Sequence, residues 1–338
     1  MENSSVLDSN NNSSLSNEGK PKGKLNKKIV IICSLITIFI IAAVVFFIIS
    51  SQSSRMVEKY INTQLSETAA EFGEGFKYNP FKCSGIKNIT CSTDFIEFRD
   101  AGQKFLAKNI SFTASPSLDK LNAGITGNIE VSAADTEIDN LIQLNFNCSD
   151  NITLLNERSL LAHNLICDSK MNNIHSSQNS VFYMKDDVYG KSSSMIGVLK
   201  AFAEKNIDIQ DQLENATVIE SSYSKIESPA LMDDIVDIMQ LFIKSYSNET
   251  IKKDDVVSLY ASLKNDYIKF KDFYGYNKYT NFMDNVINAI DGVIYDNNNS
   301  ISMSMTIKDR ESIDKMFGSE YLKFMLPDVY DIEITSSK

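Results

Sequence analysis

The sequence has no tryptophan, two histidines, five prolines and 13 glycines among its 338 residues. The scarcity of histidine leaves few metal ligands and few general bases. This composition excludes a collagen-like chain, a wholly disordered chain and a small disulfide framework. Basic residues are also outnumbered, with 33 Lys and Arg against 44 Asp and Glu, a net charge of −11. An acidic chain without a basic stripe is a poor nucleic-acid binder, because phosphate neutralisation supplies most of that affinity.

The sequence also lacks recognisable catalytic and cofactor motifs. Its many serines include no G-x-S-x-G or S-x-x-K motif in a strand-to-helix context, and no glycine-rich loop suits a phosphate. Leu161–Leu165 repeats the pattern of Leu106–Ile110 with His163 in place of Lys108, which favours a solvent-facing strand position for His163. The other histidine, His175, falls in a polar segment expected to be a loop. We therefore predict a non-enzymatic protein with no catalytic, metal or cofactor site.

One long apolar run predicts a membrane span. Residues 29–49 read IVIICSLITIFIIAAVVFFII, without a charge, a Gly or a Pro. At about 1.5 Å per residue, such a helix spans roughly 31 Å, the thickness of a bilayer hydrocarbon core. A cleaved signal peptide is the alternative, but its apolar region is usually about 7–15 residues long and precedes a small-residue cleavage site. No such site follows here, so residues 29–50 are predicted to be an uncleaved transmembrane signal-anchor.

The charges on either side of this run predict its orientation. Residues 1–28 are rich in Asn, Ser and Lys, and we expect a disordered cytoplasmic tail because they have too little apolar surface to order themselves. Five lysines lie in this tail, whereas Arg55 and Lys59 are the near positive charges after the span. The positive-inside rule therefore places the C-terminal part outside the cytoplasm. We predict a bacterial inner-membrane protein with a large periplasmic domain.

The exported part is predicted to begin with a helix and continue as a sheet. Residues 51–75 carry apolar side chains every three or four positions up to Gly73, which predicts a juxtamembrane stalk helix. From residue 76 to residue 190 the apolar period falls to two, as in the alternation of Ile142, Leu144 and Phe146 with Gln143 and Asn145. Such alternation is typical of half-buried antiparallel strands.

Four of the five cysteines lie in this predicted sheet. An even number of cysteines outside the cytoplasm indicates disulfides. Cys83, Cys91, Cys148 and Cys167 permit three pairings, of which we favour the local ones, Cys83–Cys91 and Cys148–Cys167, as bridges between neighbouring strands. Zinc binding and unpaired buried thiols are the alternatives, although the spacing does not fit a zinc knuckle.

The C-terminal half predicts helices followed by a return to strands. Residues 191–295 contain three helical stripes and form a predicted helical subdomain, with Ser228 and Pro229 as the cap of the first. The second stripe includes Tyr260, Leu263 and Phe270. Residues 296–338 predict a closing strand–helix–strand unit that rejoins the sheet. The predicted fold class is therefore α+β, with an antiparallel meander and a helical subdomain inserted before the last strands.

Three further features are candidate sites. Met303 and Met305 lie on the expected buried face of a late strand and are a possible apolar binding face. Asn298 stands in an acidic sequon that resembles the acceptor of bacterial N-glycosylation systems. Aromatic and lysine residues alternate over residues 267–279, which suits partner stacking or ordinary core packing.

The signal-anchor, the acidic β region and the segment Phe105–Phe112, FLAKNISF, resemble the AsmA-like class of bacterial envelope proteins. The resemblance concerns the style of the strands over about a third of the chain, and it implies a periplasmic role near lipids without catalysis. Our first hypothesis is a non-enzymatic protein that binds lipid or another hydrophobic envelope component. An envelope scaffold or interaction module is the second hypothesis, and a hydrolase with widely dispersed residues is the third.

Overall fold

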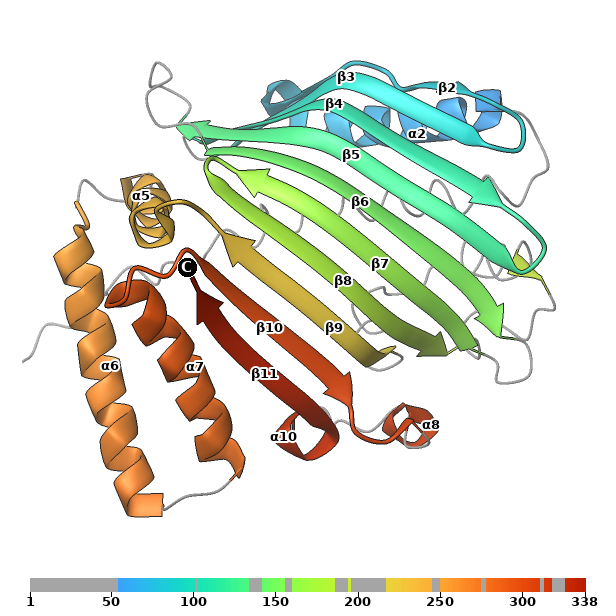
Figure 1. Cartoon of the computed structure of the whole chain (residues 1–338). Helices are drawn as coiled ribbons and strands as arrows, with labels where there is room; N and C mark the ends of the chain where they lie inside the picture. Colours follow the sequence, from blue (N-terminus) through green and yellow to red (C-terminus); the bar gives the residue numbers. More distant parts are fainter. Residues whose placement is uncertain are drawn as a thin grey trace, which may run out of the picture. The chain divides into compact units, whose positions relative to one another are not determined.

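The computed structural model describes residues 54–100, 103–133, 142–155, 160–185, 194–195, 217–244, 250–274, 278–310, 313–317 and 326–338, all within one compact unit. The predicted tail (1–28) and the predicted span (29–50) lie outside these residues. Among the helices described, none combines the length and apolar character needed to cross a membrane. The described part is α+β, with a large antiparallel sheet and a few helices (Figure 1).

The described strands form one sheet of 11 strands in the order β1-β3-β4-β5-β6-β7-β8-β9-β10-β11, with β2 also pairing with β3. Their bounds are β1 Phe76–Tyr78, β2 Lys82–Ser84, β3 Ile89–Asp100, β4 Gln103–Pro116, β5 Lys120–Ala133, β6 Ile142–Leu155, β7 Leu160–Met171, β8 Ile174–Lys185, β9 Thr217–Glu227, β10 Ser300–Ile307 and β11 Tyr330–Ser337. From β3 onward, each of these strands pairs with the one that follows it in sequence. The predicted antiparallel meander is therefore present.

The two faces of the sheet differ in chemistry. On β6, buried and half-buried Ile142, Leu144 and Phe146 alternate with exposed Gln143 and Asn145, as the period of two predicts. We name the face that carries Ile142 and Phe146 the packed face, and the opposite one the polar face. Strand partners extend each face across the sheet, because directly paired residues point the same way.

A β-bulge interrupts β4 where a glycine faces it. The pairing of β4 with β5 shifts between Lys108 and Ser111, and Asn109 has φ 51°. Gly127 lies opposite, and a Cβ at this position would stand 2.3 Å from Ile110 Cδ1. Only glycine leaves room for the Ile110 side chain that the bulge pushes across the strand.

The first described helix, α2 (Ser54–Phe72), ends in the short 3-10 turn η1 (Gly73–Gly75), close to the predicted end of the stalk. It packs against the sheet instead of standing free as a stalk. Val57 and Ile61 are buried, and Glu58 accepts a 2.9 Å hydrogen bond from the Cys83 backbone N–H. The helix therefore belongs to the folded domain.

The segment predicted to be helical also contains a strand, since β9 occupies residues 217–227. The three predicted helices follow as α5 (Leu231–Lys244), α6 (Lys253–Tyr274) and α7 (Lys278–Ile294). Ser228 is buried, and its hydroxyl receives the Ala230 N–H and donates to Asp234, so it caps α5 as predicted. A core cluster joins α5 and α7 to the packed face through Leu231, Val293 and Ile174.

The closing unit rejoins the sheet at its far edge. After β10 come two short helices, α8 (Ile313–Met316) and α10 (Leu326–Val329), and then β11. Ile307, Ile313 and Tyr330 share a second core cluster, and the Tyr330 hydroxyl donates to the Ile219 carbonyl at 3.0 Å. Burial raises the pKa of this tyrosine. The sheet is thus complete only once the last residues of the chain have paired.

Candidate functional site: the outward face of helix α6

Helix α6 presents a line of large apolar side chains to solvent. Leu259 and Leu263 are each 60% exposed, Phe270 is 53% exposed and Phe273 is 80% exposed. Their spacing of three, four or seven residues puts them on one side of the helix. We name these four residues the α6 stripe. Leu263 and Phe270 belong to the stripe that the sequence predicts to be core, so their exposure is a correction.

On the side of α6 that meets α7, the contacts are made by polar side chains. The Tyr260 hydroxyl donates to the Ile287 carbonyl at 3.1 Å and to Asp291 at 3.0 Å, and Lys264 pairs with Asp291 at 2.6 Å. About two turns further along, the hydroxyl of Tyr267 donates to Asp284 at 3.1 Å, and Lys271 pairs with the same carboxylate at 2.6 Å. A ladder of tyrosine, lysine and aspartate therefore joins the two helices.

This ladder is coupled to the ionisation of its tyrosine. Burial raises the pKa of the Tyr260 phenol, and the hydrogen bond to the Asp291 carboxylate raises it further. The contact between α6 and α7 thus depends on a protonated Tyr260 phenol that donates to the Asp291 side chain. Helix α6 therefore contacts α7 through tyrosines and lysines and presents a separate line of large apolar side chains to solvent, the arrangement expected of a binding helix.

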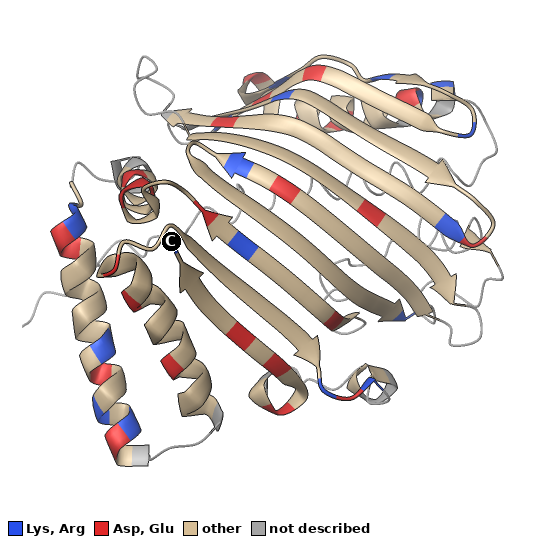
Figure 2. Ribbon diagram, viewed as in Figure 1, with Lys and Arg blue, Asp and Glu red and all other residues tan. Residues whose placement is uncertain are grey.

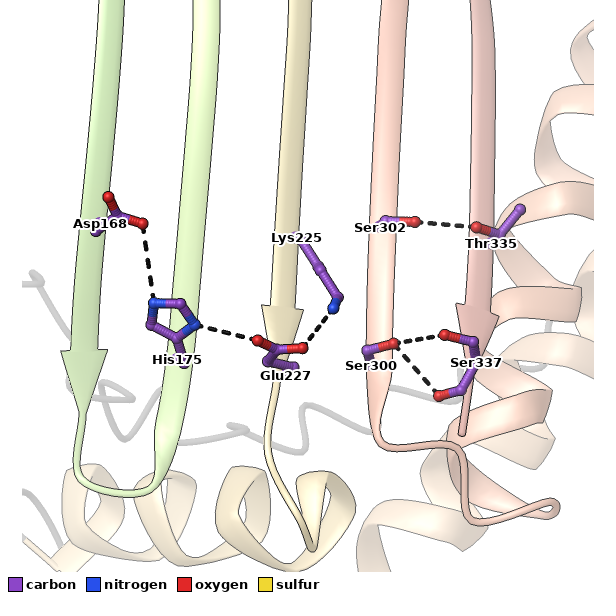
Figure 3. Close-up of polar contacts among 8 residues, drawn as sticks. All are labelled: Asp168, His175, Lys225, Glu227, Ser300, Ser302, Thr335 and Ser337. Carbon is purple, nitrogen blue, oxygen red and sulfur yellow. Dashed lines mark hydrogen bonds and ion pairs between the residues drawn. The ribbon is translucent and has the colours of Figure 1, made fainter.

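A second cluster lies on the polar face of the sheet, across β7, β8 and β9 (Figure 3). His175 Nδ1 stands 3.2 Å from Glu227, His175 Nε2 stands 3.9 Å from Asp168, and Lys225 pairs with Glu227. The hydrogen bond from Lys225 lowers the pKa of Glu227, and the one from His175 lowers it further. His175 thus lies in strand β8 and not in a loop.

Neighbouring hydroxyls on β10 are engaged with β11. Ser300 bonds to the hydroxyl of Ser337 at 2.8 Å, and Ser302 bonds to Thr335 at 3.0 Å (Figure 3). These side chains and the His175 cluster form a series of cross-strand pairs, the usual unit of sheet stabilisation. Among the residues described, no group of His, Cys, Asp or Glu is arranged to hold a metal ion. The cluster is best explained as a surface that pins the register of β7 to β11.

The other histidine is buried, in contrast to the expectation from sequence. His163 is 8% exposed, its Nδ1 stands 2.7 Å from Asp150, and its ring stacks on Phe182 with centroids 4.5 Å apart. It lies on the packed face, since it pairs directly with Ile152 of β6. The match to Lys108 misled the prediction, because the two segments occupy different places in the sheet.

Both favoured disulfides are present, and they lie in one row of the packed face. Cys83 pairs with Cys91 and Cys148 with Cys167, each directly opposite its partner in neighbouring strands. Strand pairing connects Cys91 to Phe112, Phe112 to Ile125 and Ile125 to Cys148. The bridges therefore fasten two separate pairs of strands at the same level of the sheet.

The remaining candidates have the following surroundings. Met303 is 36% exposed on the packed face, whereas Met305 is half-buried against the second core cluster. The Asn298 amide donates to the Ser336 hydroxyl at 2.8 Å, and a Cβ on Gly292 would lie 2.5 Å from its nitrogen. In the folded protein this amide is engaged and enclosed, which does not favour its use as a glycan acceptor.

Charge is distributed unevenly over these surfaces. Charged residues are sparse on the sheet strands and occur in both signs along α6 (Figure 2). Lys269 pairs with Asp266 at 3.1 Å, so charges beside the α6 stripe are balanced locally. No protein-family model and no curated protein matches this chain. The outward face of α6 is the surface of the described residues whose geometry most strongly indicates a function.

Proposed function

We propose that this chain is a non-enzymatic interaction module of the cell envelope. In this proposal residues 29–50 anchor it in the inner membrane, the domain described above lies in the periplasm, and the α6 stripe binds a partner protein. The observation that carries the proposal is the orientation of α6. It pairs Tyr260 and Tyr267 with α7 and exposes two leucines and two phenylalanines along another side.

The size and composition of the stripe support a protein partner. Large aromatic and aliphatic side chains in a line along a helix are typical anchors of helix-in-groove recognition. The two disulfides support an oxidising compartment, since such bridges persist outside the cytoplasm. The polar cluster around His175 does not support catalysis, because its members pair with one another across strands.

Site-specific crosslinking in intact cells tests this function. A photoreactive amino acid replaces Leu263 in the full chain, and the matched control replaces Asn265, which is exposed on the same helix outside the stripe. We expect one discrete adduct from position 263, little from position 265, and loss of the adduct when Phe273→Asp is added. Equal adducts from both positions, or an adduct insensitive to Phe273→Asp, would rule out the stripe as a binding surface.

A second candidate function is the binding of lipid on the packed face. Ile226 is 43% exposed and Met303 is 36% exposed there, on the neighbouring strands β9 and β10. Mass spectrometry of solvent extracts from residues 51–338, exported and purified without detergent, tests this candidate. Stoichiometric lipid that is lost in Met303→Asp would favour it, and a stable lipid-free protein would exclude it.

A further inference from the structure

Two apolar turn tips stand at one corner of the sheet. Ile86 is 90% exposed in the turn between β2 and β3, and Leu118 is 72% exposed in the turn between β4 and β5. Ile89 pairs with Ala114, so continuing this register by two residues places Lys87 opposite Pro116. The two turns are therefore neighbours, at the same end of the strands (Figure 1).

The first of these tips is held in a fixed conformation. Cys83 and Cys91 close the hairpin with a disulfide immediately behind the turn. Gly85 has φ +98°, and a Cβ there would lie 1.8 Å from the Asn88 carbonyl oxygen. The turn is thus too tight for any residue but glycine at this position. Ile86 is exposed by a rigid hairpin and not by a loose loop.

The same corner is basic in an acidic protein. Five exposed cations lie in the turn, in β2, at the start of β5 and in the first turns of α2, namely Arg55, Lys59, Lys82, Lys87 and Lys120, and among the described residues none of them forms an ion pair. Glu58 and Asp119 are the acidic residues of segments 54–59, 82–90 and 117–120, which leaves these segments with a net charge of +3. Residues 1–28 carry +2, so the chain beyond the predicted span carries −13.

The corner also lies beside the start of α2, the first described element after the predicted span. The apolar run ends at residue 49 and α2 begins at Ser54, a separation that an extended chain covers in at most about 18 Å. The first turns of α2 reach the corner directly, because Glu58 accepts the Cys83 backbone N–H at 2.9 Å. A span in the bilayer would therefore hold this corner close to the membrane surface.

We propose that this corner docks on the surface of the anionic bilayer that the anchor crosses. Ile86 and Leu118 enter the region between headgroups and acyl chains, while the five cations contact anionic headgroups. This inference rests on the membrane anchor of the proposed function and adds an orientation. In this orientation the turns β2–β3 and β4–β5, and the strand ends that they join, lie at the membrane surface.

The absence of tryptophan makes a direct test possible. Ile86→Trp gives the full chain a single tryptophan, and Tyr295→Trp places the matched control at the C-terminal end of α7, at an exposed position beside the start of β10. Each protein is reconstituted into phosphatidylcholine vesicles with about 30% phosphatidylglycerol and brominated acyl chains. Because interfacial side chains sit roughly 5–10 Å deep, we expect at least about threefold stronger quenching at position 86 than at position 295.

A charge variant supplies the second measurement. Lys82→Glu, Lys87→Glu and Lys120→Glu together, in the Ile86→Trp chain, should lower the quenching by at least about half, because each lysine near an anionic surface contributes to binding. Lys170→Glu, at an exposed position near the C-terminal end of β7 and away from the corner, should leave the quenching unchanged. If the three charge reversals leave the quenching unchanged, the electrostatic part of the proposed docking is wrong.

Vesicle flotation separates this inference from the proposed function. A chain that floats with the vesicles but shows equal quenching at positions 86 and 295 keeps its anchor, and the docking of the corner is then wrong. A chain that does not float has no anchor, and both the orientation and the membrane part of the proposed function fail. Flotation with selective quenching at position 86 supports both.

Discussion

Helices α2 and α6 lie toward opposite edges of the described sheet and use their apolar side chains in opposite ways. In α2, Val57 and Ile61 are buried, and Phe72 packs edge-to-face on Phe98 of β3 with centroids 5.5 Å apart. In α6, Leu263 and its apolar neighbours face solvent while tyrosines and lysines face α7. An apolar stripe on a helix therefore indicates a contact surface. The contact can be made within the same chain, as in α2, or with another molecule, as we propose for α6.

The largest expected effect comes from placing the same charge on each stripe. Val57→Asp puts a carboxylate at a site that is 1% exposed, so we expect a loss of at least about 4 kcal/mol in the free energy of unfolding. Leu263→Asp, at an exposed site, should change it by no more than about 0.5 kcal/mol. Urea denaturation followed by circular dichroism measures both. Similar losses in the two variants would contradict the contrast between the helices.

The next largest effect is expected from removing either of the two disulfides, because they fasten different parts of the sheet. Cys83–Cys91 fastens the hairpin on which α2 rests, and Cys148–Cys167 fastens β6 to β7 in the middle of the sheet. Loop-closure entropy predicts losses of about 2.5 kcal/mol for the double Ser variant of the first bridge and about 3.3 kcal/mol for that of the second. Loss of the first bridge should in addition expose α2 to limited proteolysis before α6. Unchanged cleavage order would show that α2 does not depend on the hairpin.

A smaller effect is expected from the amide that ties α2 to the sheet. Asn62 accepts the Phe81 backbone N–H at 2.7 Å and donates to the Phe81 carbonyl at 3.0 Å. Asn62→Ala leaves both backbone groups without these bonds, so we expect a loss of about 1–3 kcal/mol in the free energy of unfolding. Thr63→Ala, on the exposed side of the same helix, is the control and should be near neutral. Equal losses in the two variants would contradict a specific role for the Asn62 amide, because alanine itself favours the helix.

The smallest expected effect is a pH dependence of the contact between α6 and α7, which the contacts of α2 should not share. Burial and Asp291 raise the pKa of Tyr260, so its contribution is complete below the ordinary tyrosine pKa of about 10 and declines as the pH rises above it. We expect the contact between α6 and α7 to loosen at high pH while α2 stays docked. Hydrogen exchange in each helix measures this, and Tyr260→Phe should reduce the pH dependence. Simultaneous release of α2 would contradict the prediction.

Much of the architecture follows from periodicity. The alternation in β6, the cap at Ser228 and the local cysteine spacing all predicted what the structure shows. Strand β9 was missed because two consecutive positions on its packed face, Ser222 and Ser224, are serines. Ser222 bonds to Ser180 of β8 at 2.8 Å, so hydrogen bonds replace the apolar alternation that would reveal a strand.

The candidate site was harder to predict for a different physical reason. The spacing of Leu263 and Phe270 shows that they share a side of α6, but not whether α7 packs against that side or the next one. The adjoining tyrosines and lysines decide it, because their carboxylate partners on α7 are 13 to 31 residues away in sequence. Such pairings become visible only when both helices are in place.

The consecutive pairing of the strands has a consequence for how the chain acquires its structure. From β3 to β9, each strand meets a neighbour that precedes it in sequence, so its template already exists when it emerges from the ribosome or a translocation channel. Each of the four cysteines in the described sheet likewise finds its native partner in the adjacent strand. The described strands can therefore be added in the order of synthesis, and the longest wait comes before β10, until α5, α6 and α7 have been synthesised.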